Sequence, residues 1–452
     1  MIIHALVALA STFFQGEPPE KVVDRIVQAI SPEQIEADIQ KLVSFGTRHT
    51  LSQTDSDTRG IGAARRWLAS EFERYAQETG RDDVTVELES HTVKADGRRI
   101  LEDAEIVNVV CTIPGSDPLS RDRLYYVIGH YDSRASEAND IDSDAPGAND
   151  DGSGTAVCLA VARALMHEHL DATVIIMPVA GEEQGLYGAR MHAAKAAEAG
   201  KNVCAVLSCD IVGDPSGPNG LSARDRVRVF SEGLPTAVLA EEGRAMSTVR
   251  MLRSLSAESD STSRQLARYV SEVAETHELP VKPMLIFRPD RFLRGGDHTA
   301  FNEAGFPAVR MTEVYENYDH QHQDVRTEDG KQFGDLPEFV DPGYIADVAK
   351  LNAAAIVHLA SAPSTPGNAR IIVAELTNDT TLRWEASPES DVAGYEIVYR
   401  ETTSAFWQEA IDMGNTTEGT LELSKDNWFF GVRSYDNDGY RSPVAFPIAA
   451  RE

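Results

Sequence analysis

The chain has 452 residues, too many for one ordinary domain, and its 72 acidic against 42 basic side chains give a net charge of −30. Such an excess of negative charge repels phosphate backbones and argues against nucleic acid as a partner. Hydrophobic residues make up 42% of the chain, yet no long apolar run follows the N-terminus. We therefore expect a globular protein of two domains without a membrane span.

Residues 1–18 are predicted to be a signal peptide. The stretch "MIIHALVALASTFF" is apolar over the length of a signal sequence and is followed by small and polar residues. It lacks the usual basic start, and a plain N-terminal helix is the alternative. We expect export, and hence a secreted or periplasmic protein.

Residues 19–360 are predicted to form one α/β domain. Ser31, Pro32 and Gln34 mark a helix start, and the alternating residues 84–93 indicate a strand. Further along, short apolar runs alternate with helical segments, a pattern typical of a mixed, mainly parallel central sheet covered by helices. The predicted strands are 124–129, 173–180, 203–208, 281–287 and 307–311, and the predicted helices are 153–167, 187–199, 261–277, 299–304 and 343–359.

Residues 361–370, "SAPSTPGNAR", are predicted to be a linker, because Pro, Ser, Thr and Gly replace the helical pattern there. Residues 371–452 contain strand patterns only, which predicts an all-β sandwich. Trp384, "GYEIVYR" and "FFGVRSYDNDGYRS" resemble a fibronectin type III module. Its aromatic residues are better explained as core than as a ligand platform, and contact with an extracellular polymer, a cell surface or its own catalytic domain stays open.

Metal-competent side chains follow four of the apolar strands. The stretches are "VIGHYDS", "IIMPVAGEEQG", "VLSCDIVGD" and "VRMTEVYENYDHQHQD". Residues just past the carboxyl ends of strands in an open α/β sheet converge on one crevice. The expected convergent set is His130, Asp150, Glu183, Asp210 and His320, with Asp132, Glu182 and Asp324 beside it.

These side chains predict a two-metal centre. Imidazole and carboxylate ligands without thiolate suit zinc, with manganese or cobalt as alternatives. Five ligands are too many for one tetrahedral ion but suit two ions that share a carboxylate and a water. Asp150 stands in the glycine-rich "PGANDDGSG" and can bridge both ions. Adjacent acids in "GEEQG" point apart, so Glu183 can bind metal while Glu182 acts as a general base.

The ordered motifs "GHYDS", "PGANDDGSG", "AGEEQGLYGAR", "CDIVGD", "GGDHTAF" and "HQHQD" resemble the secreted co-catalytic zinc aminopeptidase family. That family also holds glutamate carboxypeptidases and glutaminyl cyclases. The resemblance covers about residues 125–325 by motif and implies a phosphorylase/hydrolase-like domain. It implies the following roles: His130 and Asp210 on the first zinc, Glu183 and His320 on the second, Asp150 as the bridge, Glu182 as the general base and Asp132 as the acid that orients His130.

Some positions in this resemblance are less direct. The family spacing between the last ligand histidine and a following aspartate selects His320 with Asp324, although His322 is also at hand. The family also has a cis peptide after the bridging aspartate, here between Asp150 and Asp151. Some relatives place an oxyanion-stabilising tyrosine directly before the last histidine, whereas this chain has Asp319 there and Tyr318 one residue earlier, which makes Tyr318 the expected oxyanion donor.

Other side chains near these motifs are also candidates. Asp297 and His298 match a pocket-lining signature, or else begin a helix. Arg291 and Arg294 could hold a peptide carboxylate or simply sit in a loop.

The resulting interpretation is a secreted zinc aminopeptidase that uses two Zn²⁺ ions, a bridging hydroxide and Glu182 to hydrolyse the N-terminal residue of peptides or proteins. A serine hydrolase is disfavoured because no GxSxG motif is present. The alternatives are a carboxypeptidase-type or glutaminyl-cyclase-type member of the family and a non-catalytic binding protein on this scaffold. A carboxypeptidase needs an Arg cluster to bind the carboxylate of its substrate. A glutaminyl cyclase typically works with one zinc. The intact Glu182 argues against a non-catalytic binding protein.

Overall fold

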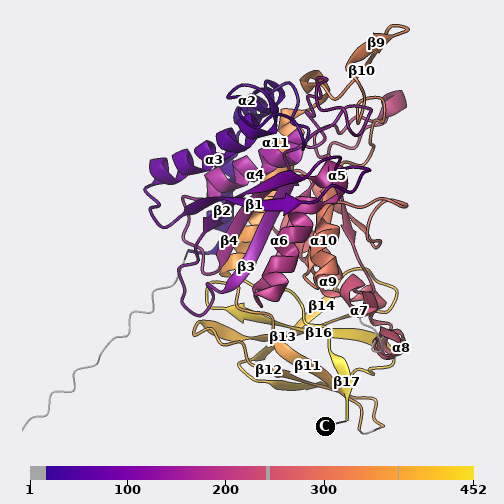
Figure 1. Cartoon of the computed structure of the whole chain (residues 1–452). Coiled ribbons are helices and arrows are strands. Elements are labelled where there is room, and N and C mark those ends of the chain that lie inside the picture. Colours follow the sequence, from indigo (N-terminus) through magenta and orange to yellow (C-terminus); the bar gives the residue numbers. More distant parts are fainter. Residues whose placement is uncertain (1–16, 241–244, 375, 452) are drawn as a thin grey trace, which may run out of the picture.

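The computed structural model describes residues 17–240, 245–374 and 376–451. A large α/β domain is followed, after helix α11 (Pro342–Ser361), by a domain of strands that lies below it in Figure 1. Residues 1–16 of the expected signal peptide lie outside the described residues. Within the described ranges, no helix is both long and apolar enough to cross a membrane.

The α/β domain is built on an eight-stranded sheet with the order β1-β2-β4-β3-β5-β8-β6-β7. Four neighbouring strands, β4, β3, β5 and β8, run parallel, whereas β1, β2 and β6 pair antiparallel with a neighbour. The mixed, mainly parallel sheet is thereby confirmed. The strands are β1 (Thr85–Val93), β2 (Ala104–Ile113), β3 (Arg123–His130), β4 (Thr173–Val179), β5 (Asn202–Cys209), β6 (Arg226–Ser231), β7 (Lys282–Ile286) and β8 (Ala308–Thr312).

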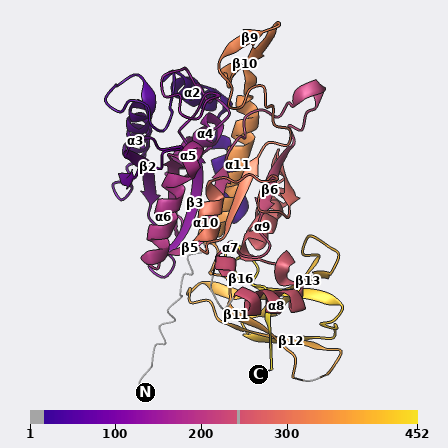
Figure 2. The same ribbon diagram turned by 45° about the vertical axis from the view of Figure 1, so that its right-hand side comes forward.

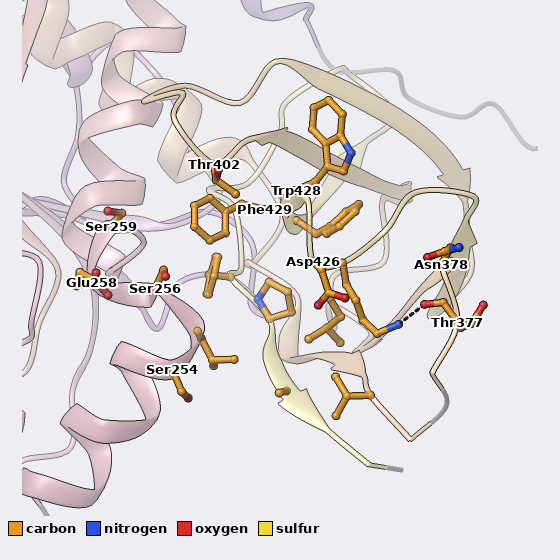
Figure 3. A pocket seen from close by; sticks show the side chains of 18 of the residues that line it. Ser254, Ser256, Glu258, Ser259, Thr377, Asn378, Thr402, Asp426, Trp428 and Phe429 are labelled. Carbon is orange, nitrogen blue, oxygen red and sulfur yellow. Dashed lines mark hydrogen bonds between the residues drawn. The ribbon is translucent and has the colours of Figure 1, made fainter.

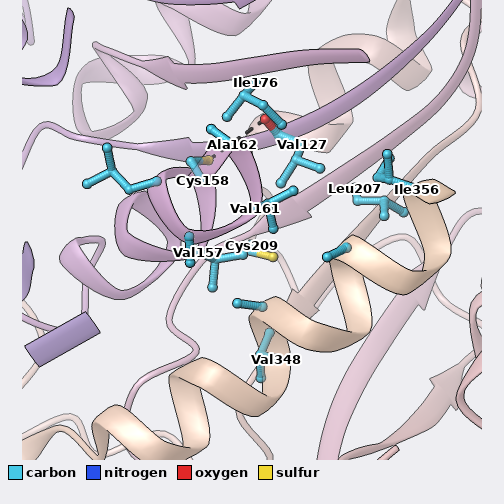
Figure 4. Packing of buried hydrophobic residues seen from close by; sticks show 14 of the residues in the cluster. Val127, Val157, Cys158, Val161, Ala162, Ile176, Leu207, Cys209, Val348 and Ile356 are labelled. Atoms are coloured by element: carbon cyan, nitrogen blue, oxygen red, sulfur yellow. Dashed lines mark hydrogen bonds between the residues drawn. The ribbon is translucent and has the colours of Figure 1, made fainter. Parts of the chain in front are cut away.

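Helices cover both faces of this sheet. Successive side chains of a strand point to opposite faces, so Val127 of β3 faces one apolar cluster and Ile128 faces the other. The larger cluster buries α4 (Gly152–Leu165) and α11 against the strands, as Val161 and Val348 show in Figure 4. The same layer includes α1 (Pro19–Ala29), α2 (Pro32–Val43), α3 (Gly60–Thr79) and α9 (Thr262–Thr276), while α6 (Tyr187–Glu198) and α10 (Asp297–Glu303) cover the other face.

Local signals set the ends of the helices that matter for the site. Asp151 caps α4, because its carboxylate accepts a hydrogen bond from the Gly154 amide at 2.8 Å. Ser31 caps α2 through the Gln34 amide, as the sequence indicates. The remaining short elements are α5 (Glu182–Gly185), α7 (Thr236–Ala240), α8 (Ala245–Leu255), β9 (Arg326–Glu328) and β10 (Lys331–Phe333).

The C-terminal strands form two packed sheets, β15-β12-β11-β17 and β14-β13-β16, which confirms the all-β sandwich. Trp384, Tyr395 and Phe430 lie in its core, as expected of its aromatic residues. The last strand pairs parallel with β11, unlike the other strand pairs of this domain. The strands are β11 (Gly367–Ile372), β12 (Thr380–Glu385), β13 (Val392–Glu401), β14 (Glu409–Gly414), β15 (Glu418–Leu421), β16 (Trp428–Asp436) and β17 (Ile448–Ala450).

Buried charges join the two domains. Asp260, just before α9, binds both Arg268 of α9 at 3.1 Å and Arg400 of β13 at 2.7 Å, and all three side chains are almost fully buried. Arg123, at the start of β3, donates to the Ala362 carbonyl at 2.8 Å. The C-terminal domain therefore packs at the amino ends of the parallel strands, as Figure 2 also shows.

A cavity of about 1210 Å³ lies beside this junction, between residues 254–259 and the C-terminal strands. Figure 3 shows Trp428 and Phe429 on the strand side and Ser254, Ser256 and Ser259 on the other. No histidine or cysteine is among the residues that line it, and the cavity lies at the end of the domain away from α5. It is therefore not the metal centre that the sequence predicts.

Candidate metal centre

The carboxyl ends of the parallel strands bring the metal-competent side chains together. His130 is the last residue of β3, and Asp210 directly follows β5. Glu183 lies in the short helix α5 after β4, and Asp150 lies in the loop that leads into α4. The site thus forms at the edge of the sheet opposite the C-terminal domain, where the topology directs these residues.

The side chains form two groups that share Asp150. In the first group, His130 Nε2 lies 3.1 Å from Asp150 Oδ1 and 3.8 Å from Asp210 Oδ1. In the second, His322 Nε2 lies 2.9 Å from Asp150 Oδ2 and 2.8 Å from Glu183 Oε1. Within each group the three ligand atoms lie within 4.8 Å of one another. Each oxygen of Asp150 therefore faces a different group, as a bridging carboxylate requires.

The donor set fits two zinc ions. Both groups offer imidazole nitrogen and carboxylate oxygen, which zinc accepts, and neither contains a thiolate. A buried carboxyl group next to them also lacks a partner for one of its oxygens. Asp297, the first residue of α10, is 1% exposed, and its Oδ1 has no hydrogen-bond partner in the described part of the chain. Divalent cations are the groups that neutralise such a concentration of negative charge.

The structure places His322, not His320, beside Asp150 and Glu183, which corrects the predicted histidine of the second group. The His320 ring instead stacks on Phe339, with ring centroids 3.6 Å apart. The physical reason is a turn over residues 318–322 in which His322 adopts a left-handed φ of 51°. A spacing rule counted along the chain cannot detect this reversal. Asp324, on which that rule depended, accepts a hydrogen bond from the Ser136 amide at 3.1 Å.

Asp132 lies between the two groups. Its side chain is fully buried, and its Oδ1 is 3.5 Å from His130 Nδ1, while Nδ1 is 3.1 Å from the Asp132 carbonyl. Its Oδ2 accepts hydrogen bonds from Thr50 Oγ1 at 2.6 Å and from the Glu183 amide at 3.3 Å. Burial alone would raise the pKa of Asp132, but the hydrogen bonds with His130 and Thr50 hold it below its usual value. Asp132 can thus fix the His130 ring.

Glu182 is partly exposed at the start of α5. Burial raises its pKa well above the usual value, and the nearby carboxylates of Asp210, Glu183 and Asp297 raise it further, while His130 opposes them. The same effects, burial first, raise the pKa of Asp297 to about 7. Glu182 is therefore a carboxylate whose proton affinity suits acid–base chemistry.

Several residues that hold the ligands were not predicted. Asp335 accepts hydrogen bonds from the amides of Asn149 at 2.8 Å and Asp150 at 2.7 Å, and so anchors the bridging loop. Asp151 accepts from the His130 amide at 2.9 Å. The Asp150–Asp151 peptide is cis, as the resemblance implies. The fully buried Arg310 places Nη2 3.0 Å from Asp210 Oδ1. No motif marks Asp335 or Arg310, because both act through contacts distant in sequence.

The other expected residues lie outside the two groups. The Tyr318 side chain is 61% exposed, so its predicted role as oxyanion donor gains no geometric support. Arg291 Nη1 binds Glu316 at 2.6 Å, and Arg294 Nη1 lies 3.4 Å from the same carboxylate. Arg228 binds it as well, at 2.7 Å. Arg291 and Arg294 therefore form ion pairs within the protein instead of a binding site for a peptide carboxylate.

Comparisons with known proteins identify relatives of the whole chain. A family model described as Peptidase family M28 matches residues 108–334. A probable zinc metalloprotease of Leptosphaeria maculans is 46% identical over 431 residues, which cover 95% of this chain and 97% of that protein. One from Pyrenophora tritici-repentis is 45% identical over 432 residues, 96% of this chain and 88% of that protein.

Two crystal structures from Legionella pneumophila share the fold. LapB has a TM-score of 0.53 and 19% identity over 76% of each chain. The LapA aminopeptidase has a TM-score of 0.51 and 21% identity over 80% of this chain and 77% of that one. The fold and the relatives together define a zinc metalloprotease. Within that class, the chain belongs to peptidase family M28.

Proposed function

We propose that the protein is an exported aminopeptidase that uses two zinc ions to remove the N-terminal residue of peptides. The observation that carries the proposal is the pair of ligand groups joined through Asp150, with Glu182 next to them. His130, Asp150 and Asp210 would hold one ion, and Asp150, Glu183 and His322 the other. When bound, the two ions polarise the scissile carbonyl and lower the pKa of water at the site.

The side chains of this protein have distinct parts in the proposed reaction. Glu182 takes the proton from the attacking water and delivers it to the departing amine. Its raised pKa favours holding that proton between the two steps. Asp132 keeps the His130 ring oriented. Asp297 Oδ1, which has no hydrogen-bond partner in the described part of the chain, offers an acceptor to the terminal ammonium group of a substrate.

The experiment compares wild type with Glu182→Gln, using aminoacyl-anilides, N-acetylated peptides and peptides with blocked or free C-termini. We expect two zinc ions per chain in both proteins, cleavage from the amino end in wild type, and a 10²- to 10⁴-fold lower kcat in the variant. Activity that survives chelation, that removes the C-terminal residue of N-acetylated peptides, or that acts on N-terminal glutamine alone would overturn the aminopeptidase assignment. Loss of zinc in the variant would make Glu182 a ligand.

Export is a separate part of the proposal and rests on the apolar residues 1–18. Expression of the full chain in an export-competent host should yield medium or periplasmic protein that begins near residue 19. Full-length protein retained in the cytoplasm would contradict it.

A further inference from the structure

Arg134 places a guanidinium group beside the second ligand group. It lies four residues after His130, in the loop that follows β3, and its Nε is 4.0 Å from Glu183 Oε2. Glu183 Oε1 in turn lies 2.8 Å from His322 Nε2. The Arg134 side chain is 14% exposed and that of His322 is 28% exposed. A molecule that reaches the second group from solvent therefore meets Arg134.

The loop holds this guanidinium in place before any ligand arrives. Arg134 Nε donates to the Ala135 carbonyl at 3.2 Å and Nη2 to the Ser136 carbonyl at 2.9 Å. On one side, the Ser133 hydroxyl donates to the Ala145 carbonyl at 2.7 Å. On the other, the Ser136 hydroxyl accepts from the Asp324 amide at 2.9 Å. Such preorganisation lowers the entropic cost of binding a charged group.

Arg134 combines spare donors with partial exposure to solvent. The Arg310 guanidinium is fully buried between Asp210 and Asp290, at 3.0 Å from each. Arg291 is held by Glu316. Within the described ranges, Arg134 Nη1 makes no hydrogen bond, and its five N–H groups exceed the two carbonyls that it serves. The free N–H groups can therefore receive an oxygen atom of a substrate.

Charge differs between the two sides of the centre. The first group has the acidic side chains of Glu182 and Asp297 near it, and Asp297 Oδ1 has no hydrogen-bond partner in the described part of the chain, whereas the second group has the Arg134 cation. A substrate with a terminal ammonium and a nearby carboxylate matches this separation. One residue of an extended peptide spans about 3.5 Å. Because the Arg134 guanidinium lies 4.0 Å from Glu183 of the second group, it reaches only the residue that follows the scissile bond. That residue carries a free carboxylate when the substrate is a dipeptide.

We infer that Arg134 is a specificity-determining residue that binds the C-terminal carboxylate of dipeptides, and that dipeptides are the preferred substrate class. This inference rests on the proposed aminopeptidase activity. The bond would be a charge-assisted hydrogen bond, which is about twice as strong as a neutral one. A peptide amide offers the same guanidinium only a neutral carbonyl.

The test measures kcat/KM for Leu-Gly, for Leu-Gly-amide and for leucine p-nitroanilide with zinc-loaded wild type, Arg134→Met, Arg134→Lys and Arg74→Met. Arg74 is the matched control, because it lies on α3 and pairs with Glu71 and Glu78 of the same helix. We expect wild type to prefer Leu-Gly over its amide by about 10- to 100-fold, the range of hydrogen bonds to charged groups. Arg134→Met should abolish this preference, Arg134→Lys should retain part of it, and Arg74→Met should keep it whole.

The outcomes separate the inference from the proposed function. Each preference compares two substrates on one protein, so incomplete folding or loss of zinc cancels from the ratio. A wild-type ratio near one, or an undiminished ratio in Arg134→Met, contradicts the role of Arg134 and leaves aminopeptidase activity intact. If zinc-loaded wild type cleaves none of the three substrates, the result contradicts the proposed function and this inference together.

Discussion

In the second ligand group, a single backbone reversal decides which histidine lies beside Asp150 and Glu183. The motif "HQHQD" offers two histidines, and the chain between residues 318 and 322 turns so that His322 faces Asp150 while His320 stacks on Phe339. Gln321, between them, donates to Asp150 Oδ2 at 2.9 Å. The residue types of the centre could be predicted from sequence, but this choice depended on a left-handed φ that no spacing encodes.

His322→Ala and His320→Ala test that choice as a matched pair. We expect His322→Ala to hold about one zinc ion per chain and to lose at least 10²-fold in kcat, because the second group loses its imidazole. His320→Ala should keep two ions and lose less than about threefold, since its ring only packs on Phe339. The zinc content and the rate of anilide hydrolysis of the two variants measure these effects. If His320→Ala loses an ion and activity while His322→Ala keeps both, His320 is the ligand.

Helices and strands with strong periodicity could be predicted, whereas elements defined by distant partners could not. The helix that Asp151 caps and the strand that ends at His130 lie where the sequence patterns predict them. By contrast, β2 and β6 were not predicted, because they interrupt the strand–helix alternation and pair antiparallel with their neighbours. The Asp335 loop follows the small hairpin β9–β10 and has no signature, although it fixes the Asp150 backbone.

The pairing of α9 and α11 makes stability sensitive to acid. His277 Nε2 and His358 Nε2 lie 2.7 Å apart, and Tyr440 of the C-terminal domain packs edge-on against His358. Burial, with further repulsion from His277 and Arg441, lowers the pKa of His358 to about 3. Because an unfolded histidine has a pKa near 6.5, the unfolded state binds the proton first and stability falls as the pH drops below that value.

His358→Phe should therefore lose less stability than wild type on acidification. Between pH 7 and pH 4.5 the contribution of His358 amounts to about 2 kcal/mol. Urea unfolding at both pH values measures it for the two proteins, with the charges that face the pair, Glu20, Asp24 and Arg441, left unchanged. Equal acid sensitivity of the two proteins would exclude His358 as the cause.

The buried Asp260–Arg268–Arg400 cluster connects the two domains. The sandwich could be predicted from its strand pattern, but its attachment could not, because the ion pair that crosses between the domains, Asp260 with Arg400, joins residues 140 positions apart. The fibronectin type III likeness is still a prediction. Because the sandwich lies at the amino ends of the strands, it supports α9 rather than the metal centre directly.

Arg400→Met tests this attachment. Removal of one partner from a buried ion cluster is expected to destabilise the protein by about 3–5 kcal/mol. The control is Arg383→Met, which removes a solvent-exposed pair with Glu418 and should change stability by less than about 1 kcal/mol. Urea unfolding of both variants gives the comparison. Equal, small effects would mean that the cluster does not hold the domains together.

The most direct test of the two-metal centre is the zinc anomalous signal from crystals of the wild-type protein grown with excess zinc. We predict two peaks, one among His130, Asp150 and Asp210 and one among Asp150, Glu183 and His322. One peak, or none at these positions, would contradict it.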